Sequence, residues 1–273
     1  MCLIAFAWRS HPRWQLVLIA NRDEFHARES LSADFLADAA DVYGGMDVRA
    51  GGSWLLVSTR NRLAAVTNVR VGLAPDAAPC SRGELVRTFA SSNSTATDFI
   101  AGLAPSAHGS QQRSWSYGRF NLLLWDGDSL HCVGNHPHFH AQEITPGLHA
   151  LSNAELDTPW PKVRRAQTAL ANWLSGQPDT NASPDLEPLF GALADRTLAG
   201  DAELPDTGVG LELERQLSPA FVAGEIYGTR CCTLVLAGRD GIHVSERRFG
   251  ANGIFAGERA VRLAHRPSRQ TLR

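Results

Sequence analysis

Two short apolar runs open the chain, CLIAFAW at Cys2–Trp8 and QLVLIA at Gln15–Ala20, and the second continues into the polar tetrad NRDE at 21–24. The turn-like segment SHPR at 10–13 separates them, so together they predict a β-hairpin that is buried on at least one face. A hairpin reverses the chain. The charged end of its second strand is therefore expected to return to the vicinity of Cys2, where the first strand begins.

Further strand pairs are expected along the chain. They are Gly52–Val57 with Leu63–Thr67, Phe120–Trp125 with Leu130–Val133 across Asp126-Gly127, and Thr229–Ala237 with Ile242–Phe249 across Arg239-Asp240-Gly241, with a lone strand near Leu148–Leu151.

Three helices are expected between the hairpins. Ser81–Phe89 begins with a capping box of Ser81 and Glu84, and Pro159–Leu174 has a prolyl start and a helical apolar period. A polar loop at Ser175–Asp185 precedes a third helix near Leu186–Ala194, and the basic stretch Glu258–Arg273 is expected to fray.

Hairpins followed by helices and then by more hairpins favour an α+β fold with layered, mostly antiparallel sheets. The 273 residues fit one large domain or two small ones, and no internal repeat or phosphate-binding glycine loop is visible. We therefore predict one domain over residues 1–273.

Composition excludes several classes of protein. With 26 basic and 28 acidic residues the formal charge is −2, which offers no field for nucleic acid. No apolar run approaches the roughly 20 residues that span a membrane, and the N-terminal residues lack the basic leader of a signal peptide. Five cysteines in no metal-binding spacing predict neither a disulfide framework nor a zinc site. These features favour a cytoplasmic protein.

Position 2 offers the most reactive combination of groups in the chain. Removal of Met1 would leave Cys2 with both a thiol and an α-amine, whose ordinary pKa is about 8. One residue would then supply a nucleophile for an acyl carbon and a base that later protonates a leaving nitrogen. The alternative is that Cys2 packs as a small apolar residue at a strand edge.

The tetrad at 21–24 offers partners for such a group. Asp23 could hold a protonated α-amine, and Arg22 could lower the pKa of the thiol or bind an oxyanion. The alternative is a solvated turn, which is the common setting for consecutive polar residues at a strand end.

Several blocks of sequence, in order along nearly the whole chain, resemble the NRDE family, also called the transport and Golgi organisation 2 group. They are Met1-Cys2, Ala20–Glu24, Gly51–Trp54, Thr67–Arg70, Ser81–Gly83, Phe120–Leu122, Leu151–Asn153, Leu156–Val163 and Tyr227–Arg230. This family in turn resembles the N-terminal-nucleophile hydrolases with an initiating cysteine, which include bile-salt hydrolase and penicillin V acylase. The resemblance implies a four-layer αββα sandwich.

The resemblance also implies roles for individual residues. Cys2 corresponds to the nucleophile, and Arg22 and Asp23 to the arginine and aspartate that follow the first hairpin. Asn153 suits the side-chain donor of an oxyanion hole and Asn68 its backbone N–H donor. Arg230 matches a distal arginine near the nucleophile.

Each of the three later assignments has a structural alternative. Asn68 and Asn153 could satisfy backbone groups at strand ends. Arg230 could be a buried salt-bridge partner of Asp23 with no chemical role.

Alternating histidines support a competing hypothesis. His136, His138 and His140 share one face if their segment is extended, and could then bind a metal or a haem iron. Pro137 favours a loop instead. The resemblance to the family bears on this point, since its members are associated with haem trafficking and with acyl-CoA or lipid metabolism.

Two functions follow from these patterns. The first is hydrolysis of a non-peptide acyl-amide bond by Cys2, which requires no cofactor. The second is a non-catalytic carrier of haem or of an acyl ligand on the same fold.

Overall fold

Two antiparallel sheets form the framework of the protein. The computed structural model describes residues 2–74, 78–105, 113–180 and 182–264, with the backbone alone for Cys2 and Arg113. The first sheet has the order β10 (Gly147–Leu151), β1 (Cys2–Trp8), β2 (Trp14–Phe25), β11 (Tyr227–Gly238), β12 (Gly241–Phe249) and β13 (Phe255–Leu263). The second has the order β3 (Ser30–Leu36), β4 (Ala39–Asp47), β5 (Leu55–Ser58), β6 (Arg62–Asn68), β7 (Phe120–Trp125), β8 (Leu130–Gly134) and β9 (His140–Glu143).

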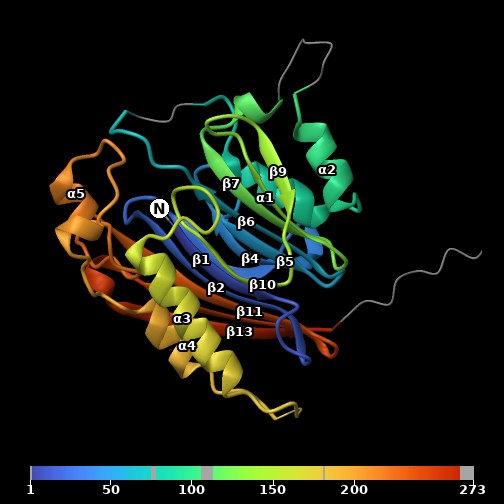
Figure 1. Cartoon of the computed structure of the whole chain (residues 1–273). Coiled ribbons are helices and arrows are strands. Elements are labelled where there is room, and N and C mark those ends of the chain that lie inside the picture. The colour runs from blue at the N-terminus through green and yellow to red at the C-terminus, as the bar shows by residue number, and fades with distance from the viewer. Residues whose placement is uncertain (1, 75–77, 106–112, 181, 265–273) are drawn as a thin grey trace, which may run out of the picture.

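Helices cover the outer face of each sheet (Figure 1). Helices α3 (Pro161–Ser175) and α4 (Glu187–Leu193) pack on the first sheet, while α1 (Arg82–Ser91) and α2 (Ala96–Leu103) pack on the second. The short helix α5 (Leu211–Gln216) lies in the segment that leads to β11. The architecture is the expected four-layer αββα sandwich.

Strand alternation explains the layers, because successive side chains of a strand point to opposite faces. Ile4 and Phe6 of β1 join the core between the sheets, whereas Leu3 and Ala5 join the core beneath α3 and α4. Strand β1 is apolar at every described position because both of its faces are buried.

Helix α1 begins where the sequence predicts, with a different cap. The Ser81 side chain accepts a hydrogen bond from the N–H of Gly83, whereas a capping box would use the N–H of Glu84. Helix α3 begins at Pro161, two residues after the expected start at Pro159, and it still has a proline in its first turn.

The structure corrects three expectations. Residues 258–263 do not fray, because they form most of β13 and pair with β12; residues 265–273 lie outside the described residues. Residues 52–54 form a loop ahead of β5. Strand β2 extends to Phe25, so the polar tetrad belongs to a strand and is no solvated turn: Asn21, Arg22 and Asp23 are all buried.

No helix within the described ranges is long and apolar enough to cross a membrane.

Candidate functional site

The β1–β2 hairpin sets the geometry of the candidate site. Cys2 pairs with Arg22 in the ladder, and Arg22 also pairs with Cys231 of β11. The side chain of Cys2 lies outside the described residues. Its backbone thus begins the strand directly opposite Arg22, as the predicted hairpin requires.

Arg22 and Asp23 are adjacent in sequence but point to opposite faces of the first sheet. Arg22 shares the face of Ala20, which packs between the sheets. Asp23 shares the face of Asn21, whose Nδ2 donates to the carbonyl of Leu193 in the helical layer. The two charges therefore act in different environments.

Arg22 is fixed by groups from the second sheet. Its guanidinium lies 4.3 Å from the centroid of the Trp54 ring, and its Nη2 lies 3.3 Å from the Asp47 carboxylate. Glu24 is 3.9 Å away. Only 6% of the side chain is exposed, and its Nη1 has no hydrogen-bond partner among the described residues.

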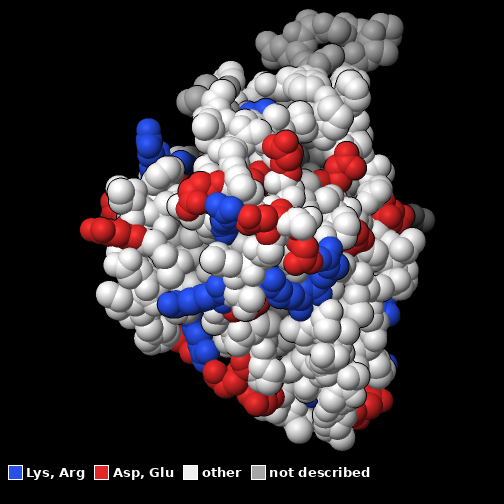
Figure 2. All heavy atoms as spheres, turned by 60° about the vertical axis from the view of Figure 1, so that its left-hand side comes forward, with Lys and Arg blue, Asp and Glu red and all other residues white. Residues whose placement is uncertain are grey.

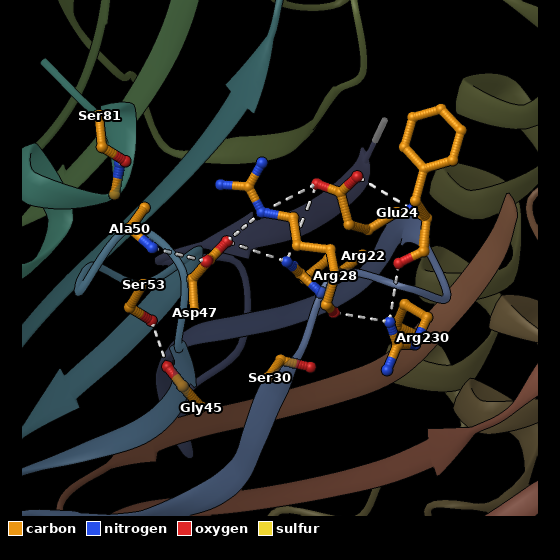
Figure 3. A network of polar contacts seen from close by, with 12 residues as sticks. Arg22, Glu24, Arg28, Ser30, Gly45, Asp47, Ala50, Ser53, Ser81 and Arg230 are labelled. Atoms are coloured by element: carbon orange, nitrogen blue, oxygen red, sulfur yellow. Dashed lines mark hydrogen bonds and ion pairs between the residues drawn. The ribbon is translucent and has the colours of Figure 1, made fainter.

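Arg28 binds the same two carboxylates. Its Nε is 2.6 Å from Asp47 and 3.7 Å from Glu24. Figure 3 shows its two terminal nitrogens turned away from both carboxylates. Asp47 thus joins two arginines, one from β2 and one from the turn that follows it.

Asp23 is buried in the outer face of the sheet, with 2% of its surface exposed. Its Oδ1 accepts a hydrogen bond of 2.7 Å from the Thr229 hydroxyl. Burial raises the pKa of the Asp23 carboxyl, while nearby positive charges, Lys162 and Arg22 among them, act in the opposite direction.

Lys162, the only lysine in the chain, is also buried. It lies in the first turn of α3, where its Nζ donates to the carbonyl of Leu217 at 3.1 Å.

Asn68 and Asn153 meet where the end of β6 approaches the end of β10. The Asn153 Nδ2 donates to the backbone carbonyl of Asn68 at 2.9 Å and to its side-chain oxygen at 3.1 Å. Arg70 N–H donates to the carbonyl of Asn153, and Thr67 donates to that of Ser152. The two asparagines predicted to share a site are therefore in direct contact, and the Asn153 side chain also satisfies the backbone carbonyl of Asn68.

Arg230 occupies a β-bulge between Thr229 and Cys231, opposite the Arg22–Asp23 step of β2. A bulge redirects its residue, and the Arg230 guanidinium donates to the carbonyls of Phe25, His26 and Arg28 (Figure 3). Its contacts within the described chain include no ion pair with Asp23. Arg230 instead holds the turn that carries Arg28.

Two cavities adjoin at Asn68, which lines both. One, of about 830 Å³, is polar and is lined by Arg22, Arg28, Asp47 and Trp54 together with the start of α1. The other, of about 720 Å³, is mainly apolar and is lined by α5 and the segment before β11.

The three histidines lie elsewhere. Residues 135–139 form a loop after β8, so the segment is not extended, as Pro137 indicates. His138 and His140 line a separate cavity of about 370 Å³ that Cys132 also lines. Among the residues that the structure describes, no three potential metal ligands cluster.

Comparison with known proteins identifies the family. The family model described as Transport and Golgi organisation 2 matches residues 1–251. The chain belongs to this family.

The human transport and Golgi organization protein 2 homolog is 32% identical to this chain over 266 residues, which cover 90% of this chain and 91% of that protein. The mouse homolog is 31% identical over 265 residues, with the same shares covered.

Among solved structures, a Caenorhabditis elegans ortholog of N-acylethanolamine-hydrolyzing acid amidase superposes with a TM-score of 0.52 at 10% identity, covering 86% of this chain and 92% of that chain. The C2A mutant of a conjugated bile acid hydrolase from Clostridium perfringens gives a TM-score of 0.47 at 11% identity, covering 96% of this chain and 92% of that chain. The first likeness shows that this Transport and Golgi organisation 2 family member has an N-terminal-nucleophile hydrolase fold.

Sequence reasoning missed several residues of the site in this family member. Asp47, Trp54 and Arg28 surround Arg22, and Thr229 binds Asp23. Trp54 and Thr229 lie within the blocks of the family resemblance. That membership was the one signal that could have singled them out, because their contacts cross between distant segments.

Proposed function

We propose that this protein is an amide hydrolase in which Cys2, freed by removal of Met1, attacks the carbonyl carbon of a linear acyl amide. The observation that carries the proposal is the pairing of Cys2 with Arg22, a buried arginine on the wall of the 830 Å³ cavity. The fold shared with N-terminal-nucleophile hydrolases supports it.

The chemistry needs only groups of this chain and water. The α-amine of Cys2 takes the thiol proton, and the thiolate attacks the acyl carbon to form a tetrahedral oxyanion. Collapse breaks the C–N bond as the ammonium returns its proton to the leaving nitrogen. Water then hydrolyses the thioester, releases the carboxylic acid and restores the thiol.

Four neighbouring residues would position this reaction. Arg22 favours the thiolate by its charge. Asp23 would hold the α-amine, and Asn153 with the Asn68 N–H would stabilise the oxyanion. In this structure the Asn153 amide donates to Asn68, so it must turn toward a substrate before it can serve in this way.

That internal contact favours the second candidate, a carrier that binds an acyl ligand or haem without turnover. A carrier would use the 720 Å³ apolar cavity and keep the Asn68–Asn153 pair intact. Titration with haem or with a fatty acid, followed by the Soret band or by the melting temperature, tests it. Tight stoichiometric binding without any acyl-amide hydrolysis would establish the carrier and end the enzymatic proposal.

The decisive test of hydrolysis combines mass and kinetics. Intact mass should show that Met1 is removed. A library of acyl amides should yield a Cys2 thioester with release of amine, and Cys2→Ala should abolish both. Retention of Met1 in active protein, or full activity in Cys2→Ala, would exclude the mechanism.

The role of Asn153 gives a quantitative prediction. Asn153→Ala removes one oxyanion donor and should lower kcat about 100- to 1000-fold. Asn172→Ala, at an exposed position of α3, is the matched control and should leave kcat unchanged. An undiminished kcat in Asn153→Ala would remove Asn153 from the site.

A further inference from the structure

The two cavities at Asn68 have unlike chemistry. The C-terminal end of β2 lies between them, with Glu24 lining the polar cavity and Phe25 the apolar one. Asn68 lines both cavities and so marks the junction, and the buried Asn153 is hydrogen-bonded to it. A ligand whose carbonyl lies at this junction would therefore extend one end into each cavity.

The lining of the apolar cavity favours a hydrocarbon chain. Leu213 and Leu217 of the α5 segment line it, with Val222 opposite in the segment before β11. Its lining also includes Leu73 and Leu198, which are 71% and 60% exposed. Large apolar side chains left in water beside a concave apolar surface indicate a binding site for an apolar group.

The polar cavity is lined by four arginines and three acidic residues, so its lining carries a net positive charge although Arg22 and Arg28 are ion-paired with Asp47. The terminal nitrogens of Arg28 and the Nη1 of Arg22 have no hydrogen-bond partner among the residues described, and neither has the exposed Arg49. The first turn of α1, with Gly83, lines the same cavity and adds the positive end of a helix dipole. In Figure 2, which turns the α5 side of the molecule forward, charges of both signs gather at the centre beside a broad uncharged surface.

From this juxtaposition we infer that the ligand of this site is an acyl amide with two unlike ends: a hydrocarbon acyl chain in the apolar cavity, and a short amine bearing an anionic group in the arginine-lined cavity. This inference rests on the proposed function. The direction follows from the two linings, because the hydrocarbon chain fits the apolar cavity and the anionic amine fits the arginine-lined cavity, on whose wall Arg22 lies opposite Cys2.

Two matched amides test the anionic end. N-dodecanoyltaurine and N-dodecanoylethanolamine share the acyl chain and a two-carbon amine, and differ in a sulfonate against a hydroxyl. Wild-type protein should cleave the taurine amide with a kcat/KM at least about tenfold higher, the range of one charge-assisted hydrogen bond. Added salt should reduce the difference in kcat/KM between the two amides. Equal kcat/KM values for the two amides would overturn the inference.

Replacement of Arg49 tests whether the arginine-lined cavity selects the sulfonate. Arg49→Ala should narrow the ratio of the two kcat/KM values about tenfold. Arg239→Ala, at an exposed arginine of the distant β11–β12 turn, should leave the ratio unchanged. Equal effects of both variants would mean that overall charge, and no specific site, selects the sulfonate.

The length of the acyl chain tests the apolar end of the ligand. Each added methylene should raise kcat/KM about fourfold until the cavity is filled, from about 0.8 kcal/mol per buried methylene. Leu213→Trp narrows the cavity and should end the rise at a shorter chain. A kcat/KM that does not depend on the length of the acyl chain would overturn the placement of that chain in the apolar cavity.

Binding to Cys2→Ala separates this inference from the proposed function. If Cys2→Ala binds the taurine amide more tightly than the ethanolamine amide by calorimetry, yet wild-type protein cleaves neither, the two-ended ligand stands and hydrolysis fails. If wild-type protein cleaves both amides without preference, hydrolysis stands and the inference fails.

Discussion

At the scale of single residues, Lys162 and Asp23 stand out as buried charged groups. Neither is explained by packing alone, since burial of a charge is costly unless opposite charge or hydrogen bonds compensate it. Lys162 lowers the pKa of Asp23 against the effect of burial. We therefore expect Lys162 to act on the reaction through Asp23, as a positioning residue.

Replacement of Lys162 tests this role. Lys162→Met should raise the pKa of Asp23 and move the acidic limb of the pH–activity profile to higher pH, whereas Lys162→Arg should restore it in part. The lost hydrogen bond to Leu217 should lower the free energy of unfolding by about 1–3 kcal/mol. Destabilisation with an unchanged pH profile would mean that Lys162 is structural only.

Glu214 and Arg70 form a second buried pair at residue scale, with 2.7 Å between Glu214 Oε2 and Arg70 Nη2. Glu214 also accepts hydrogen bonds from the backbone and side chain of Thr207, so it ties α5 both to Arg70, after β6, and to the segment that precedes α5. Glu214→Ala leaves Arg70 buried without its carboxylate and should cost about 3–5 kcal/mol in urea unfolding. A loss below 1 kcal/mol would show that water replaces the carboxylate.

At the scale of elements, the contact between β12 and β3 contains a buried carboxyl. Glu246 of β12 accepts a hydrogen bond from the N–H of Ala33 in β3, which links the two sheets. Burial raises the pKa of Glu246 above its usual range, with smaller opposing contributions from the Ala33 hydrogen bond and from Arg248.

The sign of the pH dependence follows from that shift. A carboxyl whose pKa is higher in the folded state stabilises the fold below its unfolded pKa, and this contribution is lost as pH rises through the folded pKa. Glu246→Gln stays neutral, so its free energy of unfolding relative to wild type should rise between pH 5 and pH 8. A constant difference across this range, measured by urea unfolding, would contradict the assignment.

The elements also show what sequence alone could predict. The β1–β2, β7–β8 and β11–β12 hairpins were predictable because apolar runs flank a turn signal, which is Pro12 in the first hairpin and a glycine in the other two. Strand β3 was missed because it is partly exposed and contains Ser and Asp, and the largely buried β4 was missed because Asp and two glycines interrupt its apolar residues. Strand β13 was missed because it is an edge strand, largely exposed and rich in charge.

The candidate site was predictable only in part, for a similar physical reason. Arg22, Asp23, Asn68 and Asn153 lie at strand ends, where a polar residue after an apolar run attracts notice. Asp47 ends β4, a strand that the sequence did not reveal, and Arg28 lies in the turn after β2. Their importance comes from contacts across the two sheets, which no local spacing encodes.

At the scale of the whole molecule, stability depends on the core between the two sheets. Leu18 is fully buried there, and Leu18→Ala should lower the free energy of unfolding by about 2–5 kcal/mol. Leu31→Ala, at a position 56% exposed, is the matched control and should change it by less than about 0.5 kcal/mol. Similar losses in both variants would indicate that the inter-sheet core does not dominate stability.

Because Arg22 and Asp23 point to opposite faces of the sheet, the number of residues that precede them in β2 decides which face each charge reaches. Deleting one residue between Trp14 and Arg22 would place the Asp23 carboxylate against Trp54, and inserting one would place the Arg22 guanidinium beside Thr229. Insertions at 10–13 carry no such penalty, because the turn absorbs them outside the ladder. We therefore expect insertions and deletions to leave the site intact when they fall in that turn, and to disrupt it when they fall inside the strand, even where the inserted residue is apolar.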